Sequence, residues 1–142
     1  PEGKLQAKRL VGLLNCYGPK RLVTSPWARC EQTIEPYAAA TKKKVIQRSQ
    51  LTELTSALSP RKTINAVESV FDSAMSALIC SHRPALPTIT KTLATRAVTE
   101  IRDYVLGANS LEPGEFVVLR LTLGEKPKFV SFERVNAGLP AN

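Results

Sequence analysis

Two side chains in this sequence could bind a phosphate group together, although they lie far apart along the chain. Arg29 lies one turn into a helix that we expect to follow a strand at 21–25, with Ser25 as its N-cap. A helix start leaves unpaired backbone N–H groups, and a guanidinium beside them adds a permanently charged, forked donor. His82, the single histidine, follows a second apolar strand predicted at 77–81. A guanidinium and an imidazole at two strand ends would suit an anion.

Both residues also have an ordinary structural interpretation. Arg29 could lie in solvent at the start of a capped helix, or pair with Glu31 or Glu53. A single histidine is more often a surface residue or a hydrogen-bonded core residue than a catalytic one. The position of His82 at a strand end favours the functional interpretation, because parallel sheets bind ligands beyond the carboxyl ends of their strands.

Helical and strand patterns alternate along the chain, which is typical of α/β proteins. We expect strands at 21–25, 45–48 and 77–81, and a loop at 51–54. The expected helices share an apolar stripe and a start or stop signal: one ending near Gly18, one from Pro26 to the lysines at 42–44, one from Pro60 to Ala74, and a region at 83–107 broken near Thr95. Residues 115–123 and 128–135 predict a hairpin.

This order of elements predicts an α/β fold with three layers, α/β/α. The sheet should be mostly parallel, with helices on both faces and the C-terminal antiparallel hairpin at its edge. Residues 1–142 show no internal linker and are expected to form a single domain. The chain begins with a helix that no strand precedes, so we expect the domain to lack its first strand here.

Composition narrows the class of protein. A net charge of +8 favours anionic partners, and the absence of an apolar run of about 18 residues argues against a membrane span. We expect a cytoplasmic protein without a membrane partner. Three widely spaced cysteines and one histidine favour reduced thiols over disulfides or a metal site, so no metal or other cofactor is expected.

Two segments carry a family resemblance. Thr24-Ser-Pro-Trp-Ala-Arg-Cys-Glu-Gln-Thr33, with Cys80-Ser-His-Arg-Pro84 further on, resembles the histidine phosphatase superfamily, which is also called phosphoglycerate mutase-like or SixA-like. The helix at 4–10 is similar to the family's first helix. The hairpin near Gly114 resembles the phosphatase domain that follows a Nudix domain in some actinobacterial MutT-like proteins.

The resemblance implies roles for four residues. Arg29 is similar to the arginine that binds phosphoryl oxygens, and His82 to the second histidine, which donates to the same oxygens. Glu53 resembles the acid that protonates the leaving oxygen, and is expected at the rim of the pocket. Arg83 would add a phosphate contact, although a solvent-exposed residue at a helix start is an equal interpretation.

The resemblance also implies a phosphohistidine intermediate, formed on a histidine within an Arg-His-Gly segment at the end of the first strand. This sequence contains no such segment, so we expect the nucleophile upstream of Pro1. The substrate would be a phosphorylated small molecule, a nucleotide or a phosphoprotein, and an upstream Nudix domain would be a partner.

A non-enzymatic protein is the alternative. A catalytically dead relative would still bind phosphorylated ligands, and the charge of +8 also suits a nucleic-acid-binding module. Such a module would need exposed aromatic residues on a basic surface, whereas Trp27, Tyr37 and Phe71 lie on apolar stripes. Nucleic acid is therefore the less favoured partner.

Overall fold

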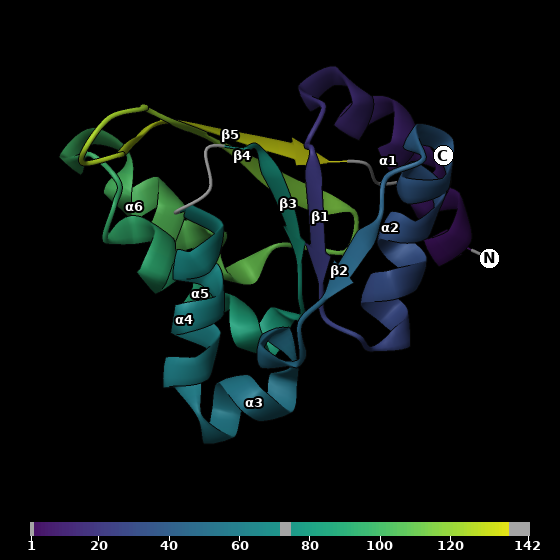
Figure 1. Ribbon diagram of the computed structural model, residues 1–142, viewed down its shortest axis with the longest axis horizontal. Helices are drawn as coiled ribbons and strands as arrows, with labels where there is room; N and C mark the ends of the chain where they lie inside the picture. The colour runs from purple at the N-terminus through teal and green to yellow at the C-terminus, as the bar shows by residue number, and fades with distance from the viewer. Residues whose placement is uncertain (1, 72–74, 137–142) are drawn as a thin grey trace.

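The computed structural model describes residues 2–71 and 75–136 (Figure 1). The helices are α1 (Glu2–Tyr17), α2 (Ala28–Thr41), α3 (Glu53–Leu58), α4 (Pro60–Phe71), α5 (Leu86–Ala94) and α6 (Thr99–Gly107). The strands are β1 (Arg21–Thr24), β2 (Val45–Gln47), β3 (Ala77–Cys80), β4 (Glu115–Leu121) and β5 (Phe129–Asn136). Three short 3₁₀ turns cover Ser49–Leu51, Arg83–Ala85 and Ala108–Ser110.

Strands β2, β1 and β3 form a parallel sheet in that spatial order. The central strand β1 has Thr24 opposite Gln47 on one side and opposite Cys80 on the other. All three strands therefore end at the same edge, as the sequence predicts for the strands that precede Arg29 and His82. Leu22 and Val23 in β1 are buried, which is typical of a central parallel strand covered on both faces.

Helices cover both faces of this sheet. Figure 1 shows α1 and α2 on one side and α4, α5 and α6 on the other. Consecutive residues of β1 belong to two different cores. Leu22 packs with side chains of α1 and α2, and Val23 packs with side chains of α4 and α5. The three-layer α/β/α prediction is confirmed.

The C-terminal hairpin is confirmed, but its predicted place at the edge of the parallel sheet is wrong. Strands β4 and β5 pair with each other in a separate two-stranded sheet. Phe129 at the start of β5 instead bonds to the connection between α5 and α6: its N–H donates to the Arg96 carbonyl at 2.8 Å, and its carbonyl accepts from Val98 at 3.0 Å. The Phe129 ring packs edge-on against Phe71 of α4, with ring centroids 5.3 Å apart.

Two local predictions are also wrong. Helix α2 begins at Ala28 with Trp27 as its N-cap, so Ser25 and Pro26 lie before the helix. The segment 51–54 is not a loop: α3 begins at Glu53, and Thr52 caps it by accepting from the Thr55 N–H at 3.2 Å.

Other helix boundaries agree with the sequence. Lys42 ends α2 in the left-handed conformation, with φ of 56°, and the predicted break near Thr95 separates α5 from α6. Ala74, the expected end of the helix that begins at Pro60, lies outside the described residues. Within 2–71 and 75–136, no helix has the length and apolar character needed to cross a membrane.

Candidate phosphate-binding site

The candidate site lies where β1 and β3 end. Because Thr24 and Cys80 are register partners, the segments that follow them leave the sheet side by side. One segment leads through Ser25 and Trp27 into α2, and the other leads through Ser81 to His82. The predicted convergence of the two strand ends is therefore confirmed.

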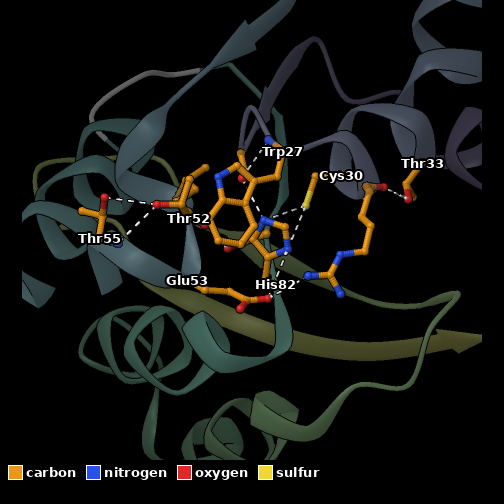
Figure 2. A network of polar contacts seen from close by, with 11 residues as sticks. Trp27, Cys30, Thr33, Thr52, Glu53, Thr55 and His82 are labelled. Atoms are coloured by element: carbon orange, nitrogen blue, oxygen red, sulfur yellow. Dashed lines mark hydrogen bonds and ion pairs between the residues drawn. The ribbon is translucent and has the colours of Figure 1, made fainter. Parts of the chain in front are cut away.

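His82 is a buried residue with close partners around its ring. The Ser25 hydroxyl lies 2.8 Å from Nε2, and the Cys30 thiol lies 3.6 Å from Nε2 and 3.8 Å from Nδ1. The indole of Trp27 covers one side, with ring centroids 4.9 Å apart (Figure 2). The Nδ1 side of the ring faces a polar group at the rim.

That polar group is an ion pair between Arg29 and Glu53. Arg29 Nη2 donates to Glu53 Oε1 at 3.1 Å, and the same oxygen lies 3.8 Å from His82 Nδ1. The Arg29 side chain is 75% exposed and the Glu53 side chain 31%, so the ion pair is partly exposed to solvent. Two groups that could bind an anion thus meet at one oxygen atom.

This geometry identifies the carboxylate partner of Arg29. Of the two carboxylates considered as partners, Glu53 forms the ion pair, while Glu31 accepts from Gln47. Glu53, which the resemblance leads us to expect at the rim, has its partly exposed carboxylate at the point where Arg29 and His82 meet. The contact is electrostatic, because the carboxylate is attracted to the positive charge of Arg29.

Glu53 is held in place by the segment before it. Thr52 is buried and caps α3, which fixes the first turn of that helix. The Ser81 hydroxyl donates to the Leu51 carbonyl at 2.5 Å and ties the end of β3 to the same segment. Glu53 and His82 therefore sit on two segments that are bonded to each other.

Burial lowers the pKa of His82, and the Arg29 charge lowers it further, while the Glu53 carboxylate acts in the opposite direction. His82 is therefore neutral at pH 7. A hydrogen bond from Cys80 lowers the pKa of the Cys30 thiol against the effect of burial, and the same pairing raises the pKa of Cys80 well above its usual range. Both cysteines are free thiols.

The N-terminal part of the chain and its fold are similar to known proteins. Residues 1–57 match the family model described as histidine phosphatase superfamily (branch 1). The resemblance to the histidine phosphatase superfamily is confirmed. The matched region contains Ser25, Arg29 and Glu53, and ends before His82.

The fold is also similar to that of a solved structure. It is the crystal structure of "the putative phosphohistidine phosphatase SixA from Agrobacterium tumefaciens", with a TM-score of 0.58 and 17% sequence identity. The match covers 93% of this chain and 77% of that one. At this identity the similarity shows the shared fold, which is the phosphoglycerate mutase-like α/β fold that the sequence predicts. No curated protein matches the chain.

Arg83, the fourth residue that the superfamily resemblance singles out, has other partners. Its Nη2 donates to Glu112 Oε2 at 3.0 Å and to the Leu111 carbonyl at 3.3 Å. The structure thus brings Arg29, Glu53 and His82 together and directs Arg83 to the segment before the hairpin. A phosphate contact from Arg83 stays a prediction and would require it to leave Glu112.

Three residues of the site have roles that sequence reasoning missed. The sequence predicts a helix cap at Ser25, an apolar stripe that includes Trp27 and a reduced thiol at Cys30, yet all three contact the His82 ring. The sequence could have pointed to Ser25 and Trp27 as site residues, because both lie in the turn between the strand and Arg29. As for metals, residues 2–71 and 75–136 contain no group of three or more histidine, cysteine or acidic side chains arranged to bind one.

Proposed function

We propose that this chain is a phosphatase domain in which Arg29 and His82 bind the phosphoryl group. The observation that carries the proposal is that both side chains approach one carboxylate oxygen of the partly exposed Glu53. A phosphoryl oxygen at the same point would take a charge-assisted hydrogen bond from the guanidinium and a second hydrogen bond from the imidazole. The first turn of α2, whose cap residue Trp27 makes no side-chain hydrogen bond, adds backbone N–H groups to the same edge.

Glu53 would then be displaced from Arg29 and act as the general acid. Its side chain is partly exposed, so its carboxyl group would lie beside a bound phosphoryl group on the side where a leaving group departs. In the first step a nucleophile forms a bond to phosphorus, the bond to the leaving oxygen breaks, and Glu53, protonated once it has left Arg29, gives its proton to that oxygen. In the second step water attacks phosphorus, the bond between the nucleophile and phosphorus breaks, and the Glu53 carboxylate takes up the proton of the water.

His82 is not the nucleophile in this proposal. Its Nε2 is bonded to Ser25 inside the protein, and the ring is covered by Trp27. His82 is also the single histidine of the sequence, so a phosphohistidine intermediate needs another one. We expect that histidine on a segment preceding residue 1. Without it, the same site would serve a phosphate-binding module that performs no hydrolysis.

The substrate proposed first is a phosphorylated protein side chain. The solved structure with this fold carries phosphohistidine phosphatase in its name. The Arg29 side chain is mostly exposed, and the exposed Leu54 and Leu58 follow Glu53 on α3. Exposed apolar side chains beside an anion site suit a large partner. A nucleotide or another phosphorylated small molecule, with a Nudix domain as its source, is the second substrate class.

Anion binding tests the site directly. We expect the chain to bind orthovanadate or inorganic phosphate in calorimetry, and Arg29→Ala to weaken binding by roughly 1.5–3 kcal/mol, the range for a hydrogen bond to a charged group. Arg134→Ala is the matched control, because Arg134 also pairs with a glutamate, Glu115, but in the hairpin. Equal affinities of the wild type and Arg29→Ala would contradict the proposal.

Hydrolysis separates the two candidate functions. The protein with its native N-terminal segment should release phosphate from a generic phosphomonoester, and Arg29→Ala should lower the rate. Vanadate binding without any hydrolysis by that longer protein would identify a phosphate-binding module and reject the phosphatase.

A further inference from the structure

Ser25 is a buried polar residue that the proposed chemistry does not use. It has no exposed surface, and its hydroxyl lies 2.8 Å from His82 Nε2. The hydroxyl oxygen also accepts from the Trp27 N–H at 3.3 Å. A buried hydroxyl between two such partners is held in one orientation, because leaving either bond unmade would cost the desolvation of a polar group.

The direction of the bond between Ser25 and His82 follows from the remaining groups. The Trp27 N–H already uses one lone pair of the hydroxyl oxygen, and among the described residues the proton of the Ser25 hydroxyl has Nε2 as its acceptor. On the other side of the ring, Nδ1 faces the Glu53 carboxylate at 3.8 Å. A lone pair on Nδ1 would face that negative oxygen, whereas a proton on Nδ1 is attracted to it.

The Ser25 hydroxyl and the Glu53 carboxylate favour the same tautomer of His82. We propose that Ser25 is a positioning residue that donates to Nε2 and thereby holds neutral His82 in the Nδ1–H form. His82 then presents a proton to the point that it shares with Arg29, and it can donate to an anion without being charged. This inference rests on the proposed phosphate-binding function for its purpose, but the tautomer itself is independent of that function.

The arrangement of Ser25, His82 and Glu53 is not a nucleophilic triad. A serine nucleophile must reach substrate, and Ser25 lies fully inside the protein. The distance of 3.8 Å between Nδ1 and Oε1 is also too long for the hydrogen bond that orients the base in such a triad. Ser25 therefore acts through His82 and not on a substrate.

Other groups that face the ring do not replace Ser25. The Cys30 thiol lies 3.6 Å from Nε2, and a thiol is a weaker hydrogen-bond partner than a hydroxyl at 2.8 Å. Among the described residues, Glu53 and Arg29 are the charged groups that act on the ring; Glu53 lies toward Nδ1, and Arg29 pairs with the same carboxylate oxygen. Removing the Ser25 hydroxyl should therefore weaken the preference of His82 for an unprotonated Nε2.

The test uses nitrogen-15 NMR on the ring nitrogens, which needs no assignment because the chain has a single histidine. The wild type above the pKa of His82 should show the Nδ1–H tautomer. Ser25→Ala should shift the population toward Nε2–H and weaken orthovanadate binding about tenfold, as for one impaired hydrogen bond to a charged group. Ser25→Thr keeps the hydroxyl and should restore the tautomer.

Ser81→Ala is the matched control. Ser81 adjoins His82 in sequence and its hydroxyl donates to the Leu51 carbonyl, so this variant removes a neighbouring hydrogen bond without touching the ring. It should leave the Nδ1–H tautomer unchanged. A wild-type spectrum of the Nε2–H form would overturn the inference whether or not any variant folds. An unchanged tautomer in Ser25→Ala would overturn it too. An Nδ1–H spectrum in a protein that binds no vanadate would support the role of Ser25 and reject the proposed function alone.

Discussion

The indole of Trp27 lies against the imidazole of His82, with ring centroids 4.9 Å apart and ring planes inclined by 50°. Trp27 is itself 38% exposed, so it forms the outer cover of a buried histidine. This contact keeps water from the ring and contributes to the burial that lowers the pKa of His82.

Removing this cover should return His82 toward its ordinary pKa. In Trp27→Ala water reaches the imidazole, the desolvation of the charged form is relieved, and the pKa rises toward about 6.5. An NMR titration of the single histidine measures the change. Trp27→Phe retains an aromatic ring over His82, so most of the lowering of the His82 pKa should remain. A pKa that stays equally low in Trp27→Ala would show that other neighbours exclude the water.

Stability should depend on pH through His82. Because its folded pKa is lowered, the unfolded chain binds the proton first as the pH falls, and unfolding becomes easier. The contribution of the neutral histidine is fully present above about pH 6.5 and is lost between that value and the lower folded pKa, with a slope of at most about 1.4 kcal/mol per pH unit. Urea unfolding between pH 5.5 and 8 measures this slope, and His82→Gln should flatten it. A stability that rises as the pH falls through this window would contradict the assignment.

The sequence predicts the parts of the fold that depend on local pattern. Leu22 and Val23 mark a central strand because both are apolar, and Pro60 marks the start of α4 because proline suits a first helical position. The convergence of β1 and β3 follows from a general property of parallel sheets. These features need no knowledge of which side chains meet.

The features that local pattern does not predict depend on contacts between distant residues. A serine before a proline resembles a helix cap, but the hydroxyl of Ser25 is bonded to His82 at the end of another strand. The six-residue helix α3 is too short to show a period. The hairpin pattern is local, whereas its bonds at Phe129 are to Arg96 and Val98, which no alternation of residues could reveal.

The buried hydroxyl of Tyr37 is a group whose removal should not destabilise the protein. Tyr37 on α2 has no exposed surface, and no hydrogen-bond partner for its hydroxyl lies within the part of the chain that the structure describes. Burying an unpaired hydroxyl costs about 1–3 kcal/mol. Tyr37→Phe should therefore leave the free energy of unfolding unchanged or raise it by about 1 kcal/mol. Tyr104→Phe is the control, since Tyr104 is 65% exposed and should have no effect. A loss of stability in Tyr37→Phe would reveal a partner for this hydroxyl.

Glu53 should oppose anion binding and assist hydrolysis, and one substitution can distinguish these two effects. Its carboxylate competes with an incoming anion for Arg29 and also repels it, so Glu53→Gln should strengthen orthovanadate binding. Two unit charges about 4 Å apart in water interact by about 1 kcal/mol, which corresponds to about fivefold in affinity. Hydrolysis by a longer protein that includes the proposed upstream histidine should fall at the same time, by about 10²–10⁴-fold for loss of a general acid. Glu115→Gln breaks the ion pair with Arg134 in the hairpin and should change neither quantity. Weaker vanadate binding in Glu53→Gln would mean that the carboxylate holds Arg29 in position for the anion, and that it does not occupy the anion's place.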